Sequence, residues 1–201
     1  MNKYKNIKSI IFDLNGTIIP KLSTSENHRK FLENFILSLK LKSKNLPKLN
    51  MSTKSILETN KIPYGKYLDY RDRNYNYKKE YSKSPLLQNL FRKLSKKYRL
   101  IVLTNTTKYF AKRSTTLLGI NNYFDFIISR ELTLNKKVIK KPNIKVYDLI
   151  LYLAECEPNE ILVLGNKYEK DIKPFEERGA SGILIENETY LEKELLKILT
   201  T

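Results

Sequence analysis

The sequence contains one cysteine, one histidine and no long apolar run, and each shortage excludes a class of protein. A lone Cys156 cannot form an internal disulfide or a thiolate metal cluster, so we expect a soluble, cytoplasmic protein. A lone His28 excludes histidine-based metal sites and argues against Ser-His-Asp or Cys-His catalysis. No stretch approaches the roughly 18–20 apolar residues of a membrane span, and residues 1–14 lack the pattern of a signal peptide. Catalysis would therefore depend on carboxylates, lysines and hydroxyls.

Acidic residues are also scarce. The chain has 21 Asp and Glu against 38 Lys and Arg, which gives a net charge of +17. Such a charge raises the local concentration of anions and favours association with nucleic acid or acidic substrates. The lysines gather at 40–54 and 136–145, but solvated surfaces have the same composition, and an AT-rich coding sequence would give it too. Nucleic acid is thus a candidate partner, which the charge alone does not establish.

Short apolar runs alternate with helical patterns through the second half of the chain. The runs that predict buried strands are 9–14, 100–103, 126–128, 161–164 and 182–185. The segments with helical spacing are 84–94, 108–118, 143–154, 170–178 and 188–199. This alternation predicts an α/β fold of the Rossmann-like kind, a parallel sheet with helices on both faces and ligands beyond the carboxyl ends of the strands.

Residues 22–83 interrupt this alternation because they contain no convincing strand. Ser25 can cap a helix that ends by Pro47, residues 52–59 predict a short helix, and residues 64–81 carry six tyrosines. Tyrosines can stack on a base, but aromatic residues at near-helical spacing are more typical of packing.

We interpret this block as a small helical insertion after the first strand. The predicted domains are a core of residues 1–21 and 84–201 and an insertion of residues 22–83.

Four polar segments follow the predicted strands. Asp13 lies in FDLNGT, Thr104 and Asn105 end IVLTN, Lys141 lies in KKPNIKVY ahead of a helix, and Asp171 closes GNKYEKD. Each segment alone is a weak signal, since an aspartate before a turn is a common cap. Their order and their positions at strand ends together indicate one site at the edge of the sheet.

These segments resemble the haloacid dehalogenase-like hydrolase superfamily over nearly the whole chain. Residues 11–17, 100–105, 141–147 and 161–171 match its four motifs in order. Residues 61–124 further resemble the pyrimidine 5′-nucleotidase-like branch, which has a small helical cap after the first strand. The resemblance implies the superfamily's fold and a hydrolase that acts on a small phosphorylated substrate.

The resemblance also assigns roles to single residues. Asp13 is the expected nucleophile that forms a covalent aspartyl-phosphate. Thr104, with the adjacent backbone amide of Asn105, would hold a phosphoryl oxygen, and Lys141 would neutralise charge on the nucleophile and the transferred group. Asp171 would anchor Lys141 or bind a metal. The expected Mg²⁺ ligands are Asp13, Asn15 through its backbone carbonyl, Asn166 and Asp171.

Two asparagines depart from the family pattern. In family phosphatases the residue at position 15 is an aspartate that protonates the leaving group. Asn15 cannot act as a general acid or base, because an amide does not ionise in this way. Asn166 stands where those phosphatases have a magnesium-binding aspartate, so we expect reduced metal affinity. Glu169 is near enough in sequence to compensate, although a helix could equally direct it to solvent.

Three functions remain open from the sequence. The first is a phosphatase for a nucleotide-like or other small phosphomonoester, with a weakened Mg²⁺ site. The second is a degenerate, non-catalytic member that binds a phosphorylated ligand, a nucleic acid or a protein. The third is a metal-independent 2-haloacid dehalogenase, which also carries Lys and Tyr at the positions of Lys141 and Tyr147.

Overall fold

The computed structural model describes residues 4–39, 52–134 and 137–200. The chain divides into two compact units, one formed by Met1–Pro20 and Lys83–Thr201 and the other by Lys21–Ser82. The end expected at Pro47 and the lysines of residues 40–51 lie outside the described residues. Across the described residues, no helix is both long and apolar enough to cross a membrane.

The larger unit is built on a five-stranded sheet in which every neighbouring pair is parallel. Its order is β3-β2-β1-β6-β7. The strands are β1 (Ser9–Phe12), β2 (Arg99–Leu103), β3 (Phe126–Ile128), β6 (Ile161–Gly165) and β7 (Ser181–Leu184). The predicted α/β fold with a parallel sheet is thereby confirmed.

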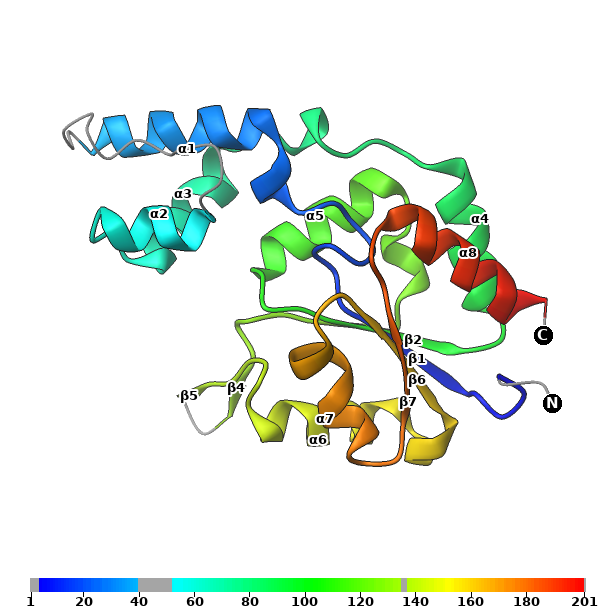
Figure 1. The fold of residues 1–201 in the computed structure, drawn as a ribbon. Helices are drawn as coiled ribbons and strands as arrows, with labels where there is room; N and C mark the ends of the chain where they lie inside the picture. Colours follow the sequence, from blue (N-terminus) through cyan, green and yellow to red (C-terminus); the bar gives the residue numbers. More distant parts are fainter. Residues whose placement is uncertain (1–3, 40–51, 135–136, 201) are drawn as a thin grey trace. The chain divides into compact units, whose positions relative to one another are not determined.

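Helices cover both faces of this sheet (Figure 1). On one side lie α4 (Pro85–Leu94), α5 (Lys108–Leu118) and α8 (Glu188–Leu199), and on the other lie α6 (Ile144–Ala154) and α7 (Lys173–Glu176). Ser84 caps α4 as expected, since its hydroxyl accepts from the Leu87 N–H. Gly119 ends α5 with a φ of 76°, a left-handed conformation that glycine adopts without strain.

The central strand β1 contributes buried residues to the hydrophobic core. All four of its residues are buried, and the Phe12 ring lies 5.3 Å from that of Phe91 on α4. Burying a side chain such as Ile or Phe contributes roughly 1.5–3 kcal/mol relative to leaving it exposed. The strand that precedes Asp13 is therefore held rigidly from both faces.

Two local predictions were wrong, and one element was missed. The first strand ends at Phe12 rather than at residue 14, because the chain turns there. A small antiparallel hairpin, β4 (Thr133–Leu134) with β5 (Lys137–Val138), was not predicted. The helix expected over 170–178 is a π-helical turn, η6 (Tyr168–Ile172), followed by the single α-helical turn α7, where Pro174 lacks the N–H that a continuous helix needs.

The smaller unit contains the helices α1 (Glu26–Ser38), α2 (Thr53–Thr59) and α3 (Tyr64–Asn74). Short 3₁₀ turns lie at Leu22–Thr24 and Tyr77–Lys79 in this unit, and at Asn121–Tyr123 and Pro158–Glu160 in the larger one. The helical character expected for this stretch is present. Tyr67, Tyr75, Tyr77 and Tyr81 are buried, so most of the six tyrosines serve packing, as their spacing favoured.

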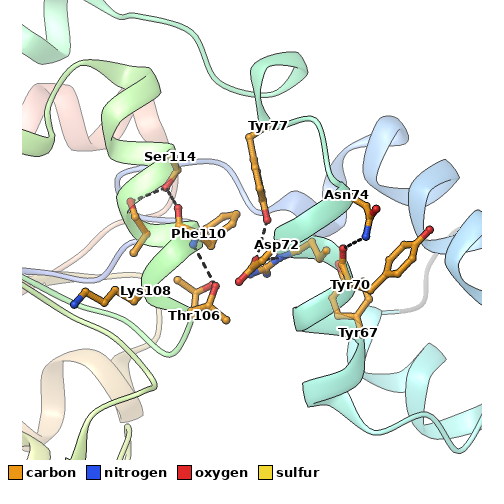
Figure 2. A network of polar contacts seen from close by, with 12 residues as sticks. Tyr67, Tyr70, Asp72, Asn74, Tyr77, Thr106, Lys108, Phe110 and Ser114 are labelled. Atoms are coloured by element: carbon orange, nitrogen blue, oxygen red, sulfur yellow. Dashed lines mark hydrogen bonds and ion pairs between the residues drawn. The ribbon is translucent and has the colours of Figure 1, made fainter.

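Polar groups are buried among these rings. Arg71 is almost fully buried and pairs with Asp72 at 2.7 Å, and the Tyr77 hydroxyl donates to the same carboxylate at 3.0 Å (Figure 2). His28 of α1 lies in hydrogen-bond contact with the Tyr67 hydroxyl. A buried charge or imidazole persists only when such partners are present.

His28 makes the stability of the smaller unit depend on pH. Burial, with the nearby Arg71 charge, lowers the pKa of His28 to about 4, while Glu80 opposes the shift. In the unfolded chain the imidazole takes a proton below about pH 6.5. The contribution of the neutral ring is therefore present above pH 6.5 and is lost as the pH falls toward 4, by on the order of 3 kcal/mol at most.

We expect His28→Gln, which keeps a neutral polar side chain, to flatten the fall in unfolding free energy between pH 6.5 and 4. Urea denaturation at several pH values, compared with the unaltered protein, isolates this histidine from the carboxylates. Equal pH slopes in the two proteins would contradict the buried, neutral imidazole.

Candidate active site

Asp13 lies immediately beyond the buried end of β1. Its backbone N–H donates to the Leu164 carbonyl of β6 at 2.9 Å, so the last hydrogen bond of the ladder fixes its position. The chain then reverses at Gly16, whose φ of 83° favours glycine, and the Gly16 N–H reaches the Ile19 carbonyl at 2.6 Å. The Asp13 side chain is 10% exposed and faces the carboxyl edge of the sheet.

Thr104 and Asn105 follow the neighbouring strand β2. Thr104 is buried, and its hydroxyl oxygen accepts from the Thr106 N–H at 3.3 Å, which leaves the hydroxyl proton to donate. The Asn105 side-chain amide donates to the Lys141 carbonyl at 2.8 Å. Within the described residues, no hydrogen bond uses the Asn105 backbone N–H, which therefore remains a donor for a ligand.

Lys141 brings the distant segments together. Its ammonium lies 2.7 Å from Asp13 Oδ1 and 2.6 Å from Asp171 Oδ1, and all three side chains are nearly buried. Removing one partner of a buried pair typically costs about 3–5 kcal/mol, because the other charge stays buried. The lysine thus acts as the centre of a charged cluster with a net charge of −1, and two of its three ammonium protons are used within it.

Asp171 projects from the π-helical turn η6. Its Oδ1 accepts from Lys141 and its Oδ2 accepts from the Lys167 N–H at 2.9 Å, so both oxygens are occupied. The carboxylate reaches this position because residue 165 is glycine, since a Cβ there would come within 2.3 Å of the Asp171 Cβ. The geometry places Asp171 as the anchor of Lys141. It leaves the carboxylate less available as a metal ligand.

Tyr147 also contacts the π-helical turn η6. Its hydroxyl donates to the Lys170 carbonyl at 2.9 Å, and its buried ring packs edge-on against Phe175 at 5.2 Å. π-helical turns are frequent at functional sites. The sequence singled out Tyr147 through the family pattern alone, and no local pattern indicated that its partner would be a backbone carbonyl.

Burial and charge shift the proton affinities of this cluster. Burial raises the pKa of the Asp13 carboxyl above its ordinary value, and the Lys141 ammonium opposes that shift. Burial alone would lower the pKa of Lys141, but Asp13 and Asp171 outweigh it and hold that pKa above its usual range. Lys141 therefore stays charged at neutral pH and can stabilise negative charge on a ligand.

Two oxygens in the segments that follow β1 and β6 are available to a magnesium ion. The Asn166 Oδ1 atom is buried without a hydrogen-bond partner among the described residues, and the Asn15 carbonyl there accepts no hydrogen bond either. Mg²⁺ takes one or two carboxylates and completes its shell with waters and substrate phosphate. Asp13, the Asn15 carbonyl and Asn166 would hold it. No group of three or more His, Cys, Asp or Glu side chains in the described part of the chain offers a stronger site.

Glu169 does not supply the missing carboxylate. Its side chain is 71% exposed and pairs with Lys173 one turn later at 2.9 Å. Of the two orientations that the sequence left open, the structure shows the one toward solvent.

The comparisons with known proteins identify the family of the chain. The family model of the haloacid dehalogenase-like hydrolases matches residues 10–182, which contain all four segments of the site. The chain belongs to this family. The expected hydrolase is thereby confirmed at the level of the family, whereas the finer assignment to the nucleotidase-like branch is not.

Individual relatives are distant. A glyceraldehyde 3-phosphate phosphatase from Methanothermobacter thermautotrophicus is 32% identical over 94 residues, which are 47% of this chain and 40% of that protein. A HAD phosphatase from Thermococcus onnurineus superposes with a TM-score of 0.63 at 19% identity, covering 94% of this chain and 98% of its own. The putative HAD-hydrolase YfnB from Bacillus subtilis, bound to magnesium, gives 0.60 at 16% identity, covering 98% and 100%. The two structures share the fold.

Proposed function

We propose that this protein hydrolyses a small phosphomonoester through a phosphoryl group held covalently on Asp13. The observation that carries the proposal is the Lys141 ammonium between Asp13 and Asp171 in a buried cluster at the sheet edge. Such a cluster holds a carboxylate in place beside a cation, which can neutralise charge on an anionic ester as the carboxylate attacks. The curated relative named as a phosphatase supports the same class of substrate.

The first half of the reaction uses Asp13 as the nucleophile. Because Oδ1 pairs with Lys141, the Oδ2 atom attacks phosphorus, the bond from phosphorus to the ester oxygen breaks, and an aspartyl-phosphate forms. The third Lys141 proton, the Thr104 hydroxyl and the Asn105 backbone N–H would donate to the phosphoryl oxygens. Such donors act where negative charge develops and are typically worth about 10²–10³-fold each.

The second half of the reaction regenerates the free Asp13 carboxylate. Water attacks the phosphorus of the aspartyl-phosphate, the bond to Asp13 breaks, and inorganic phosphate leaves. Asn15 can neither protonate the departing alkoxide nor take a proton from this water, so both protons are exchanged with solvent. Positioned acid-base help is usually worth about 10²–10⁴-fold, so we expect slow turnover.

A bound Mg²⁺ would supply further neutralisation of the phosphoryl charge. In this chain Asp13, the Asn15 carbonyl and the Asn166 amide oxygen would hold it, with neutral groups in two of the three places. We infer a weak requirement for the metal.

The helical unit Lys21–Ser82 is the proposed cap that selects the substrate. It is compact in itself, it is inserted directly after the loop that carries Asp13, and it buries its own aromatic core. Its buried Arg71–Asp72 pair and tyrosines stabilise this unit. The two substrate classes to compare are a triose phosphate, as the name of the curated relative indicates, and a nucleotide, as the resemblance of residues 61–124 implies.

The test is phosphate release from a panel of esters in the presence and absence of Mg²⁺. The panel should contain glyceraldehyde 3-phosphate, p-nitrophenyl phosphate and pyrimidine nucleoside monophosphates. We expect slow, Mg²⁺-stimulated release from at least one of them. No release from any ester would remove the proposal and leave the non-catalytic function, whereas halide release from a 2-haloacid without metal would replace it with dehalogenation.

A further inference from the structure

We infer that Asn105 is a positioning residue, which holds the Lys141 backbone through its side chain and thereby sets where the ammonium lies. This inference rests on the proposed phosphatase reaction for its kinetic effect and on geometry for its cause. It adds a role for the Asn105 side chain to the expectation that the Asn105 backbone N–H binds phosphate.

The Lys141 carbonyl needs a donor from elsewhere in the chain. Residue 142 is proline and has no N–H, and the Asn143 N–H donates to the preceding carbonyl, that of Lys140, at 2.8 Å. Lys141 is itself buried, although residues 142–145 are exposed, and the backbone carbonyl of a buried residue is rarely left without a partner. The Asn105 side-chain amide supplies the bond at 2.8 Å, across 36 positions of sequence.

This bond joins the loop after β2 to the loop before α6. Asn105 directly follows Thr104, whose backbone N–H is fixed by the Ile128 carbonyl at 2.9 Å, so its own position is rigid. Lys141 lies two residues before Asn143, which caps α6 by accepting from the Lys145 N–H at 3.0 Å. The Lys141 backbone is therefore held by α6 on one side and by Asn105 on the other.

The consequence concerns the third ammonium proton of Lys141. Asp13 and Asp171 define two of its directions, and the backbone position decides whether the remaining proton points at the phosphoryl group. A displacement of about 1 Å at a reacting group can cost on the order of 10²-fold in rate. A single, partly exposed hydrogen bond contributes little to global stability, so its loss should affect catalysis much more than folding.

The experiment compares Asn105→Ala with Gln88→Ala. Gln88 makes the same kind of bond, from its side-chain amide to the Leu118 carbonyl at 3.1 Å across 30 positions of sequence, in the larger unit and outside the residues of the site. Both variants should melt within a few degrees of the unaltered protein. With the best ester of the panel, we expect Asn105→Ala to lower kcat by about 10–100-fold with KM changed less than about threefold, and Gln88→Ala to change neither. A rise in KM with kcat unchanged would overturn the inference in favour of a phosphate ligand.

A second measurement does not need turnover. The Nζ proton signal of a buried, doubly paired ammonium exchanges slowly enough for ¹H–¹⁵N NMR, and Lys141→Arg identifies it by its loss. We expect Asn105→Ala to shift or broaden this signal, and Gln88→Ala to leave it in place. An unchanged signal in Asn105→Ala would overturn the inference. If no ester is hydrolysed, the proposed function fails while this measurement still decides the role of Asn105.

Discussion

Asp13→Asn is expected to reduce phosphate release by at least about 10³-fold, the largest loss that any single substitution in this protein should cause. The amide has nearly the shape of the carboxylate, but it cannot attack phosphorus and form the covalent ester. Lys141 keeps its ion pair with Asp171, so its charge is not left alone in the interior. Phosphate release from the best ester of the panel, at saturating substrate, measures the effect.

The covalent intermediate gives the same variant a direct readout. Acid quenching during turnover, followed by peptide mass spectrometry, should find one phosphoryl group on Asp13 of the unaltered protein and none in Asp13→Asn. Asn122→Asp, an exposed change in the same unit, serves as a control for expression and handling. Turnover in Asp13→Asn comparable with that of the control would rule out nucleophilic catalysis by this residue.

Restoring two carboxylates should produce the largest gain. We expect Asn15→Asp with Asn166→Asp to raise phosphate release by about 10²–10⁴-fold, because position 15 would then protonate the leaving group and activate water. Asn166 contributes differently. Its buried, unpartnered amide oxygen would become a charged oxygen, which Mg²⁺ binds more strongly.

The two substitutions can be separated by their readouts. Asn166→Asp alone should tighten Mg²⁺ binding in isothermal titration calorimetry, whereas Asn15→Asp alone should mainly raise kcat. Asn122→Asp adds one negative charge away from the site and should do neither. No gain in the double variant would show that the asparagines do not limit this site.

Much of the site could be predicted from the sequence because its parts follow apolar runs. Asp13, Thr104 and Asn166 each come directly after a buried strand of a parallel sheet, and such a sheet brings all its carboxyl ends to one edge. The meeting of Asp13 with Lys141, 128 positions later, was expected from family resemblance and is present at 2.7 Å.

Other features of the fold and the site could not be predicted, because no sequence pattern indicates them. The strands of the β4–β5 hairpin have two residues each, too few to show alternation. The π-helical turn that carries Asp171 has an ordinary helical composition, whereas Gly165 leaves room for the Asp171 side chain and the Tyr147 hydroxyl donates to the Lys170 carbonyl of the turn. The bonds from Asn105 and Tyr147 end on backbone carbonyls, which carry no information in the sequence.

The order of the strands has a consequence for the sequence of events in folding. β1 is the first strand of the described sheet along the chain and the central one in it, but its two neighbours, β2 and β6, lie far along the chain. Its apolar SIIF segment must therefore wait for partners during synthesis, and contacts between such distant segments form slowly. Because Asp171 follows β6, the charged cluster closes only once that strand has docked. Appearance of activity should thus mark the end of folding rather than an early stage.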